Sequence, residues 1–171
     1  MPLPADDAII QGLMRFWEQA RGARPMPAKS DMDPVRLGAR LLPHILLVET
    51  VEGGTRFRYR LCGSANTDAA GMDLTGRHVD ELNPHPDYIR YMVGLYRQAQ
   101  ASGRPVYSES RYLALATNTA RDTRRLICPL SSDGATVDNF ISAQTFQHVG
   151  AERAPPIAAG DRFEPRTVEV L

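Results

Sequence analysis

The chain has 171 residues, 43% hydrophobic and 23% charged, which fits one globular domain with its own core. Twenty basic and twenty acidic residues give a net charge of zero, which argues against broad contact with nucleic acid or an anionic membrane. No apolar run is long enough to cross a membrane, and the first residues lack the pattern of a signal peptide. Cys62 and Cys128 lie in apolar runs without metal-ligand spacing, so we expect reduced thiols and a cytoplasmic protein.

An amphipathic helix is predicted from about Asp7 to Arg21. Its apolar stripe, at helical spacing, consists of Ile10, Leu13, Met14, Trp17 and Ala20. Ile9 and Phe16 widen this stripe beyond what docking on one domain requires, so we predict a homodimer through this helix. The residues predicted for the dimer contact are Ile9, Leu13, Phe16 and Trp17. Alternatively, the proline-containing connector folds back over this face, with Met26 and Met32 filling the gap.

The connector from residue 22 to residue 34 contains three prolines, and a short helix is expected from Pro34 to Leu42. Two strands, Ile45–Val51 and Arg56–Cys62, then form a hairpin around the Gly53-Gly54 pair. In the second strand Phe57, Tyr59 and Leu61 alternate with three arginines, which predicts one buried face and one polar face. We interpret the arginines as protection of an edge strand rather than as a nucleic-acid site.

The second half of the chain predicts one longer helix and three strands. The helix is expected over Asp87–Ser102, and the strands over Pro105–Leu115, Arg124–Leu130 and Thr136–Gln147. Strands in runs separated by helices indicate an α+β fold with an antiparallel sheet. After Val149 the composition shifts to Ala, Pro, Gly and charge, so we expect residues 150–171 to form a loosely held tail whose removal costs little stability.

This order of elements resembles the PAS fold, and local motifs sharpen the resemblance. The motifs are Phe57–Ser64 followed by Gly71–Gly76, and upstream Trp17, Arg21, Pro27, Ser30–Pro34 and Leu41–Pro43. Over residues 16–146 the chain is similar to stand-alone bacterial PAS proteins of the PAS_5 type. The resemblance implies a five-stranded antiparallel sheet in the order 2-1-5-4-3, with helices closing a cavity over one face. It divides the chain into an N-terminal helix and connector (1–43), a PAS-like domain (44–148) and a C-terminal tail (149–171).

No residues are assigned to catalysis or metal binding. The four histidines have no metal-ligand spacing, and none lies in the long helix where some PAS domains hold haem. Of these, His85 is expected in a loop or at a helix N-cap. Cys62 ends a strand without the helical motif of flavin-binding PAS domains, so no cofactor is expected.

Apolar and tyrosine side chains are predicted to line a cavity between the sheet and the long helix. The candidate ligand-binding residues are Phe57, Tyr59, Leu61, Tyr88, Met92, Leu95, Tyr96 and Leu126. The sequence therefore predicts a non-catalytic sensory or regulatory module in bacterial signalling that binds a small apolar or aromatic ligand, a partner protein, or both. The alternatives are a protein-interaction module with a filled core and a small α+β enzyme.

Overall fold

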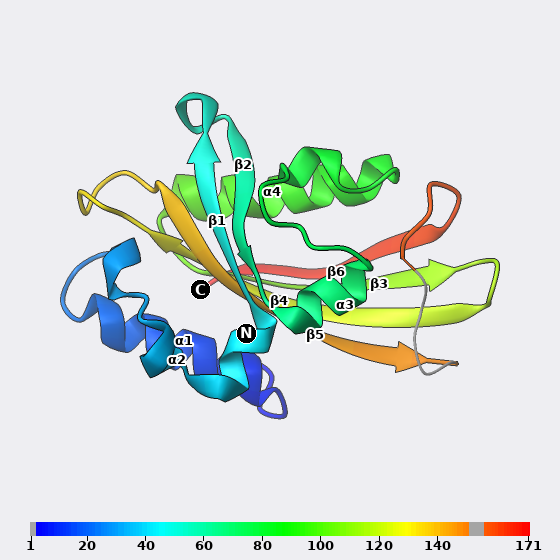
Figure 1. The fold of residues 1–171 in the computed structure, drawn as a ribbon, viewed down its shortest axis with the longest axis horizontal. Coiled ribbons are helices and arrows are strands. Elements are labelled where there is room, and N and C mark those ends of the chain that lie inside the picture. Colours follow the sequence, from blue (N-terminus) through cyan, green and yellow to red (C-terminus); the bar gives the residue numbers. More distant parts are fainter. Residues whose placement is uncertain (1–2, 151–155) are drawn as a thin grey trace.

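A six-stranded antiparallel sheet forms the centre of the protein (Figure 1). This computed structural model describes residues 3–150 and 156–171. The strands are β1 (Ile45–Val51), β2 (Arg56–Cys62), β3 (Val106–Ala114), β4 (Thr119–Leu130), β5 (Asn139–Val149) and β6 (Arg162–Val170), in the spatial order β2-β1-β5-β4-β3-β6. The α+β class and the predicted order 2-1-5-4-3 are confirmed. The predicted count of five strands is wrong, because β6 adds an edge strand beside β3.

Helices connect the strands and cover the sheet. The α-helices of the described residues are α1 (Ala8–Arg21), α2 (Pro34–Leu41), α3 (Ser64–Ala70) and α4 (Pro86–Ser102). The 3-10 turns are η1 (Lys29–Asp31), η2 (Leu42–His44), η3 (Glu52–Gly54) and η4 (Val79–Glu81). Capping residues set the start of α1 and the end of α4. The Asp7 carboxylate accepts hydrogen bonds from two backbone N–H groups of the first turn of α1 at 3.0 and 3.2 Å, and Gly103, with φ of +63°, ends α4.

The sheet is covered on both faces, by α1 on one side and by α3 and α4 on the other (Figure 1). In the pairing of β4 with β5, Arg125 lies opposite Gln144 and Leu126 lies opposite Ala143. Thr145, two residues from Ala143, donates a hydrogen bond of 2.5 Å to the N-cap carboxylate of α1. Because alternate strand residues point to opposite faces, Leu126 and Ala143 face α1, whereas Arg125 and Gln144 face α3 and α4.

The apolar stripe of α1 is buried against its own domain. Leu13 is fully buried, and Phe16 and Trp17 are only 6% and 4% exposed. The Trp17 indole N–H also donates a hydrogen bond of 2.8 Å to a backbone carbonyl of β4. Met26 and Met32 of the connector join the same core. Burial of these two methionines in the same core agrees with the alternative to the dimer.

Ile9, the remaining residue predicted for a dimer contact, is half-buried and packs against the same core. The width of the apolar stripe predicted a homodimer, but in a single chain the residues of this stripe already pack against the core of the domain. The homodimer stays a prediction, which sedimentation velocity at high micromolar concentration would test.

A β-bulge changes the expected alternation of β2. Leu47 pairs with Leu61, but the next residue, Val48, pairs with Tyr59, so Arg60 is an extra residue on β2. Phe57 and Tyr59 are buried as predicted, whereas Leu61 is 37% exposed. The prediction that Leu61 shares their buried face is therefore wrong.

The arginines of β2 face carboxylates on the outside of the sheet. Arg56 forms ion pairs of 2.9 and 2.6 Å with Asp80 and Glu81, and Arg58 forms one with Glu49. β2 is an edge strand, as the interpretation of these arginines required.

The C-terminal segment is ordered into the sheet, so the prediction of a loosely held tail is wrong for residues 162–170. β6 pairs antiparallel with β3 along the length of both strands. The Phe163 ring lies 5.2 Å from the Tyr88 ring and 5.1 Å from the Tyr91 ring, both on α4. The residues between 150 and 156, which belong to the same prediction, lie outside the described residues. Sparse apolar composition suggested a free tail, but the pairing of β6 with β3 docks it together with a few apolar side chains, namely Ile157, Phe163, Val170 and Leu171.

We predict that Phe163→Ala lowers the free energy of unfolding by about 2 kcal/mol, because it removes a half-buried aromatic ring from contact with two tyrosines. Val168→Ala is the matched control on the same strand, since Val168 is 41% exposed, and its effect should stay below about 1 kcal/mol. Urea unfolding followed by circular dichroism measures both. Equal effects of the two substitutions would show that β6 is only loosely held.

Candidate ligand cavity

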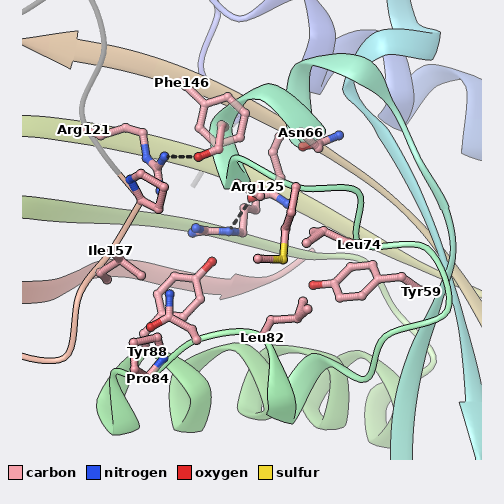
Figure 2. A pocket seen from close by; sticks show the side chains of 16 residues that line it. Tyr59, Asn66, Leu74, Leu82, Pro84, Tyr88, Arg121, Arg125, Phe146 and Ile157 are labelled. Atoms are coloured by element: carbon pink, nitrogen blue, oxygen red, sulfur yellow. Dashed lines mark hydrogen bonds between the residues drawn. The ribbon is translucent and has the colours of Figure 1, made fainter.

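A cavity of about 200 Å³ lies between the sheet and the α3–α4 side of the domain (Figure 2). Its walls come from β2, α3, the loop after α3, the start of α4, β4, β5 and the segment before β6. Most of the lining side chains are apolar or aromatic. The described lining residues are Tyr59, Asn66, Ala69, Ala70, Met72, Leu74, Leu82, Asn83, Pro84, Tyr88, Arg121, Arg125, Gln144, Phe146, Pro156 and Ile157. A concave, mostly apolar space with a few convergent polar groups is typical of a small-molecule site.

Two arginines from β4 supply positive charge to the cavity wall. Arg125 is 2% exposed and donates hydrogen bonds to the Gln144 side chain at 2.9 Å and the Ser110 hydroxyl at 2.8 Å. Arg121 is 7% exposed and donates to the carbonyl of Ala69 at 2.8 Å. The described lining residues include no Asp or Glu. The cavity therefore has a positive polar side and an apolar remainder.

Two tyrosine hydroxyls point toward the same space as Arg125 (Figure 2). Burial raises the pKa of Tyr59 well above its ordinary value, so this hydroxyl stays neutral at physiological pH. The Tyr88 ring lies 5.9 Å from the Arg125 guanidinium carbon, within the range of a cation–π contact. Both tyrosines combine an apolar ring with a hydroxyl at the cavity wall.

The segment before β6 closes one side of the cavity with Pro156 and Ile157. Asp161 holds this segment in place, because its carboxylate accepts hydrogen bonds from the Tyr112 hydroxyl at 2.7 Å and from the backbone N–H groups of Leu115 and Ala158 at 3.0 and 2.7 Å. Burial raises the pKa of Asp161, but these hydrogen bonds outweigh it and the net effect is a lowered pKa. The cavity wall thus depends on a residue near the end of the chain.

Only part of the predicted ligand-binding set reaches this cavity. Tyr59 and Tyr88 line it, whereas Leu61 lies on the exposed side of the bulge and Leu126 faces α1. The rest, Phe57, Met92, Leu95 and Tyr96, are buried in the filled core beside the cavity. Whether the predicted set binds a ligand stays a prediction.

The polar residues of the cavity are the ones that the sequence analysis missed. Arg125 is absent from the predicted ligand-binding set because Leu126 and its alternate neighbours form a clear apolar pattern. That pattern marks the opposite face of β4. Arg121 lies before the predicted strand, which begins at Arg124, because residues 119–123 are mostly polar and show no apolar alternation. A usable signal was present, since Arg121 and Arg125 occur at an even spacing that places both on one face of a strand.

The described residues contain no group of three or more His, Cys, Asp or Glu side chains that could hold a metal ion. His85 is the N-cap of α4, as predicted, and its Nδ1 accepts a hydrogen bond from the Tyr88 N–H at 3.4 Å. No helix of the described chain is long and apolar enough to span a membrane.

A family model of a PAS domain, PAS_5, matches residues 6–144, which is most of the chain. The chain belongs to the PAS domain family. No curated protein matches the chain significantly. Membership confirms the resemblance noted in the sequence and indicates a sensory or regulatory module. The PAS family model ends at Gln144, so the C-terminal wall of the cavity and β6 lie outside the matched region.

We predict that Asp161→Asn destabilises the protein by about 1–2 kcal/mol near neutral pH, because the charged acceptor of three hydrogen bonds is lost. The pKa of Asp161 is lowered by folding, so its contribution is present above the ordinary carboxyl pKa and disappears as the pH falls through the lowered value. The difference between wild type and variant should therefore shrink below about pH 4. Urea unfolding from pH 3 to pH 7 measures this.

Glu164→Gln is the control for the Asp161 substitution, since Glu164 is an exposed acid on β6. Its effect should stay within about 0.5 kcal/mol at every pH. A difference between wild type and Asp161→Asn that does not change with pH would mean that the carboxylate charge has no role in holding the wall.

Proposed function

We propose that this PAS protein is a non-catalytic sensory or regulatory module whose cavity binds a small apolar or aromatic molecule. The observation that carries the proposal is the cavity of about 200 Å³, which combines aliphatic and aromatic walls with a few inward-facing polar groups. An engineered apolar cavity of about 150 Å³ accommodates benzene, so the space suits a molecule slightly larger than one aromatic ring. In the cell, the module would act in cytoplasmic bacterial signalling together with a partner protein or a second copy of itself.

The arrangement of the walls supports a response to ligand binding. The cavity lies between the sheet on one side and two separate segments on the other, α3 with its following loop and the segment before β6. A ligand that fits one arrangement of these segments better than another shifts the population toward that arrangement. Because Ile157 lines the cavity a few residues before β6, a change in the position of this segment would alter how β6 packs at the edge of the sheet.

The test is a cavity-filling substitution read out by native mass spectrometry. Ala70 lines the cavity from α3, so Ala70→Leu adds three carbon atoms to a space that a ligand would occupy. Ala101→Leu is the matched control, since Ala101 is exposed on α4 and away from the cavity lining. We expect wild type and Ala101→Leu, freshly purified from a bacterial host, to carry an extra small mass that is lost on denaturation, and Ala70→Leu to be bare.

The same variants give a second readout in thermal unfolding with a set of small aromatic compounds. Stabilisation of wild type and Ala101→Leu, without stabilisation of Ala70→Leu, supports ligand binding in the cavity. Bare wild-type protein that none of the compounds stabilises would overturn the proposal and favour a protein-interaction module.

A further inference from the structure

Arg125 is a buried cation whose protein partners are neutral. Its side chain is 2% exposed, and its two hydrogen bonds go to the amide oxygen of Gln144 and the hydroxyl of Ser110. None of the ion pairs among the described residues includes Arg125. Arginine is seldom fully buried without an anion, because removing its charge from water is unfavourable.

The neighbouring arginine shows the opposite arrangement. Arg124 points to the α1 face of the sheet and its side chain is 33% exposed. It nevertheless has three acidic neighbours, Asp6 at 3.1 Å, Glu109 at 3.6 Å and Asp7 at 3.8 Å. The more exposed arginine, Arg124, therefore has carboxylate partners, whereas the buried Arg125 has none among the described residues.

The Arg125 guanidinium retains free hydrogen-bond donors beside the cavity. It has five N–H groups, of which Nε uses one toward Gln144 and Nη1 uses one toward Ser110. No hydrogen bond among the described residues uses Nη2. The rings of Tyr88 and Tyr91 lie 5.9 and 6.0 Å from the guanidinium carbon, and these weak contacts leave the N–H donors free.

We propose that the cavity binds a small organic carboxylate, whose two oxygens accept hydrogen bonds from the free Nη1 and Nη2 N–H groups of Arg125. This inference rests on the proposed function and specifies its ligand class. The paired N–H groups of a guanidinium match the geometry of a carboxylate. An aromatic ring or short alkyl chain of the ligand packs against the apolar wall formed by Leu74, Leu82 and Ile157 (Figure 2).

The remainder of the cavity favours a carboxylate over a phosphate. A phosphate group carries up to two charges and three acceptor oxygens, and its sites use lysines or several backbone N–H groups in addition to arginine. The described lining residues include no lysine. The cavity volume of about 200 Å³ fits one ring or a short chain together with a carboxylate.

The test compares acids with their neutral amides by isothermal titration calorimetry on the full chain. The probes are sodium benzoate with benzamide and sodium hexanoate with hexanamide, since each pair has nearly the same shape and differs in charge. At least one acid should bind with a stoichiometry of one and at least about tenfold more tightly than its amide. Inorganic phosphate, added as a competitor at equal concentration, should not displace the acid.

Substitutions then assign the effect to Arg125. Arg125→Gln should weaken binding of the acid at least about tenfold while leaving binding of the amide unchanged within about threefold. Arg124→Gln is the matched control, because it removes the same charge from the adjacent position on the opposite face, and it should leave acid binding unchanged within about twofold.

Several results would overturn the carboxylate proposal. Equal binding of acid and amide, or acid binding that survives Arg125→Gln, would overturn it while leaving the proposed small-ligand function in place. Tighter binding of phosphate than of either acid would assign the site to phosphate instead. No binding of either acid to wild type would also overturn it, and the mass carried by the purified protein would still test the proposed function separately. If Arg125→Gln does not fold, the comparison of acid with amide on wild type decides by itself.

Discussion

The covering of the sheet on both faces determines where every side chain of its central strands must go. β4 and β5 lie in the middle of the sheet, with α1 on one side and α3 and α4 on the other. Their register places Leu126 and Ala143 toward α1 and Arg125 and Gln144 toward the cavity. A slip of one residue would exchange these two sets, placing the guanidinium in the apolar layer under α1. The same register therefore specifies both the core and the polar side of the cavity.

The cavity lies beside a core that is filled with tightly packed aromatic side chains. The Phe57, Tyr96 and Phe140 rings pack with centroids 5.2 to 5.7 Å apart and occupy the space between α4 and the sheet. In this region large side chains from both α4 and the sheet fill the space between them. At the cavity, by contrast, part of the cover is the seven-residue helix α3, whose small side chains Ala69 and Ala70 leave room beside the arginines of β4. A rigid core next to an open space is the arrangement expected of a preorganised binding site.

The C-terminal segment links the cavity to the edge of the sheet. Phe163 packs against two tyrosines of α4, and Asp161 binds Tyr112 of β3, so the cavity wall at Ile157 is held from both sides. The matched PAS region ends before this segment. The sixth strand therefore lies outside the matched region, and the segment that precedes it contributes Pro156 and Ile157 to the cavity wall. Arg121 and Arg125 supply positive charge to that cavity, and the segment before β6 supplies one of its apolar walls.

The elements with local signals follow from the amino-acid sequence alone. Asp7 begins α1 and Gly103 ends α4, as their capping chemistry requires. The Gly53-Gly54 pair placed the hairpin, and the order of elements with its motifs identified the PAS fold. The face of the sheet to which each side chain points depends on tertiary contacts. The bulge at Arg60 turned Leu61 outward, and the two-sided burial of β4 made Arg125 indistinguishable from a surface arginine in a one-dimensional pattern. Alternation of polar and apolar residues identifies the buried face of a strand only where the other face is polar. In β4 both faces are buried, so the register between β4 and β5 places Arg125 and Gln144 at the cavity.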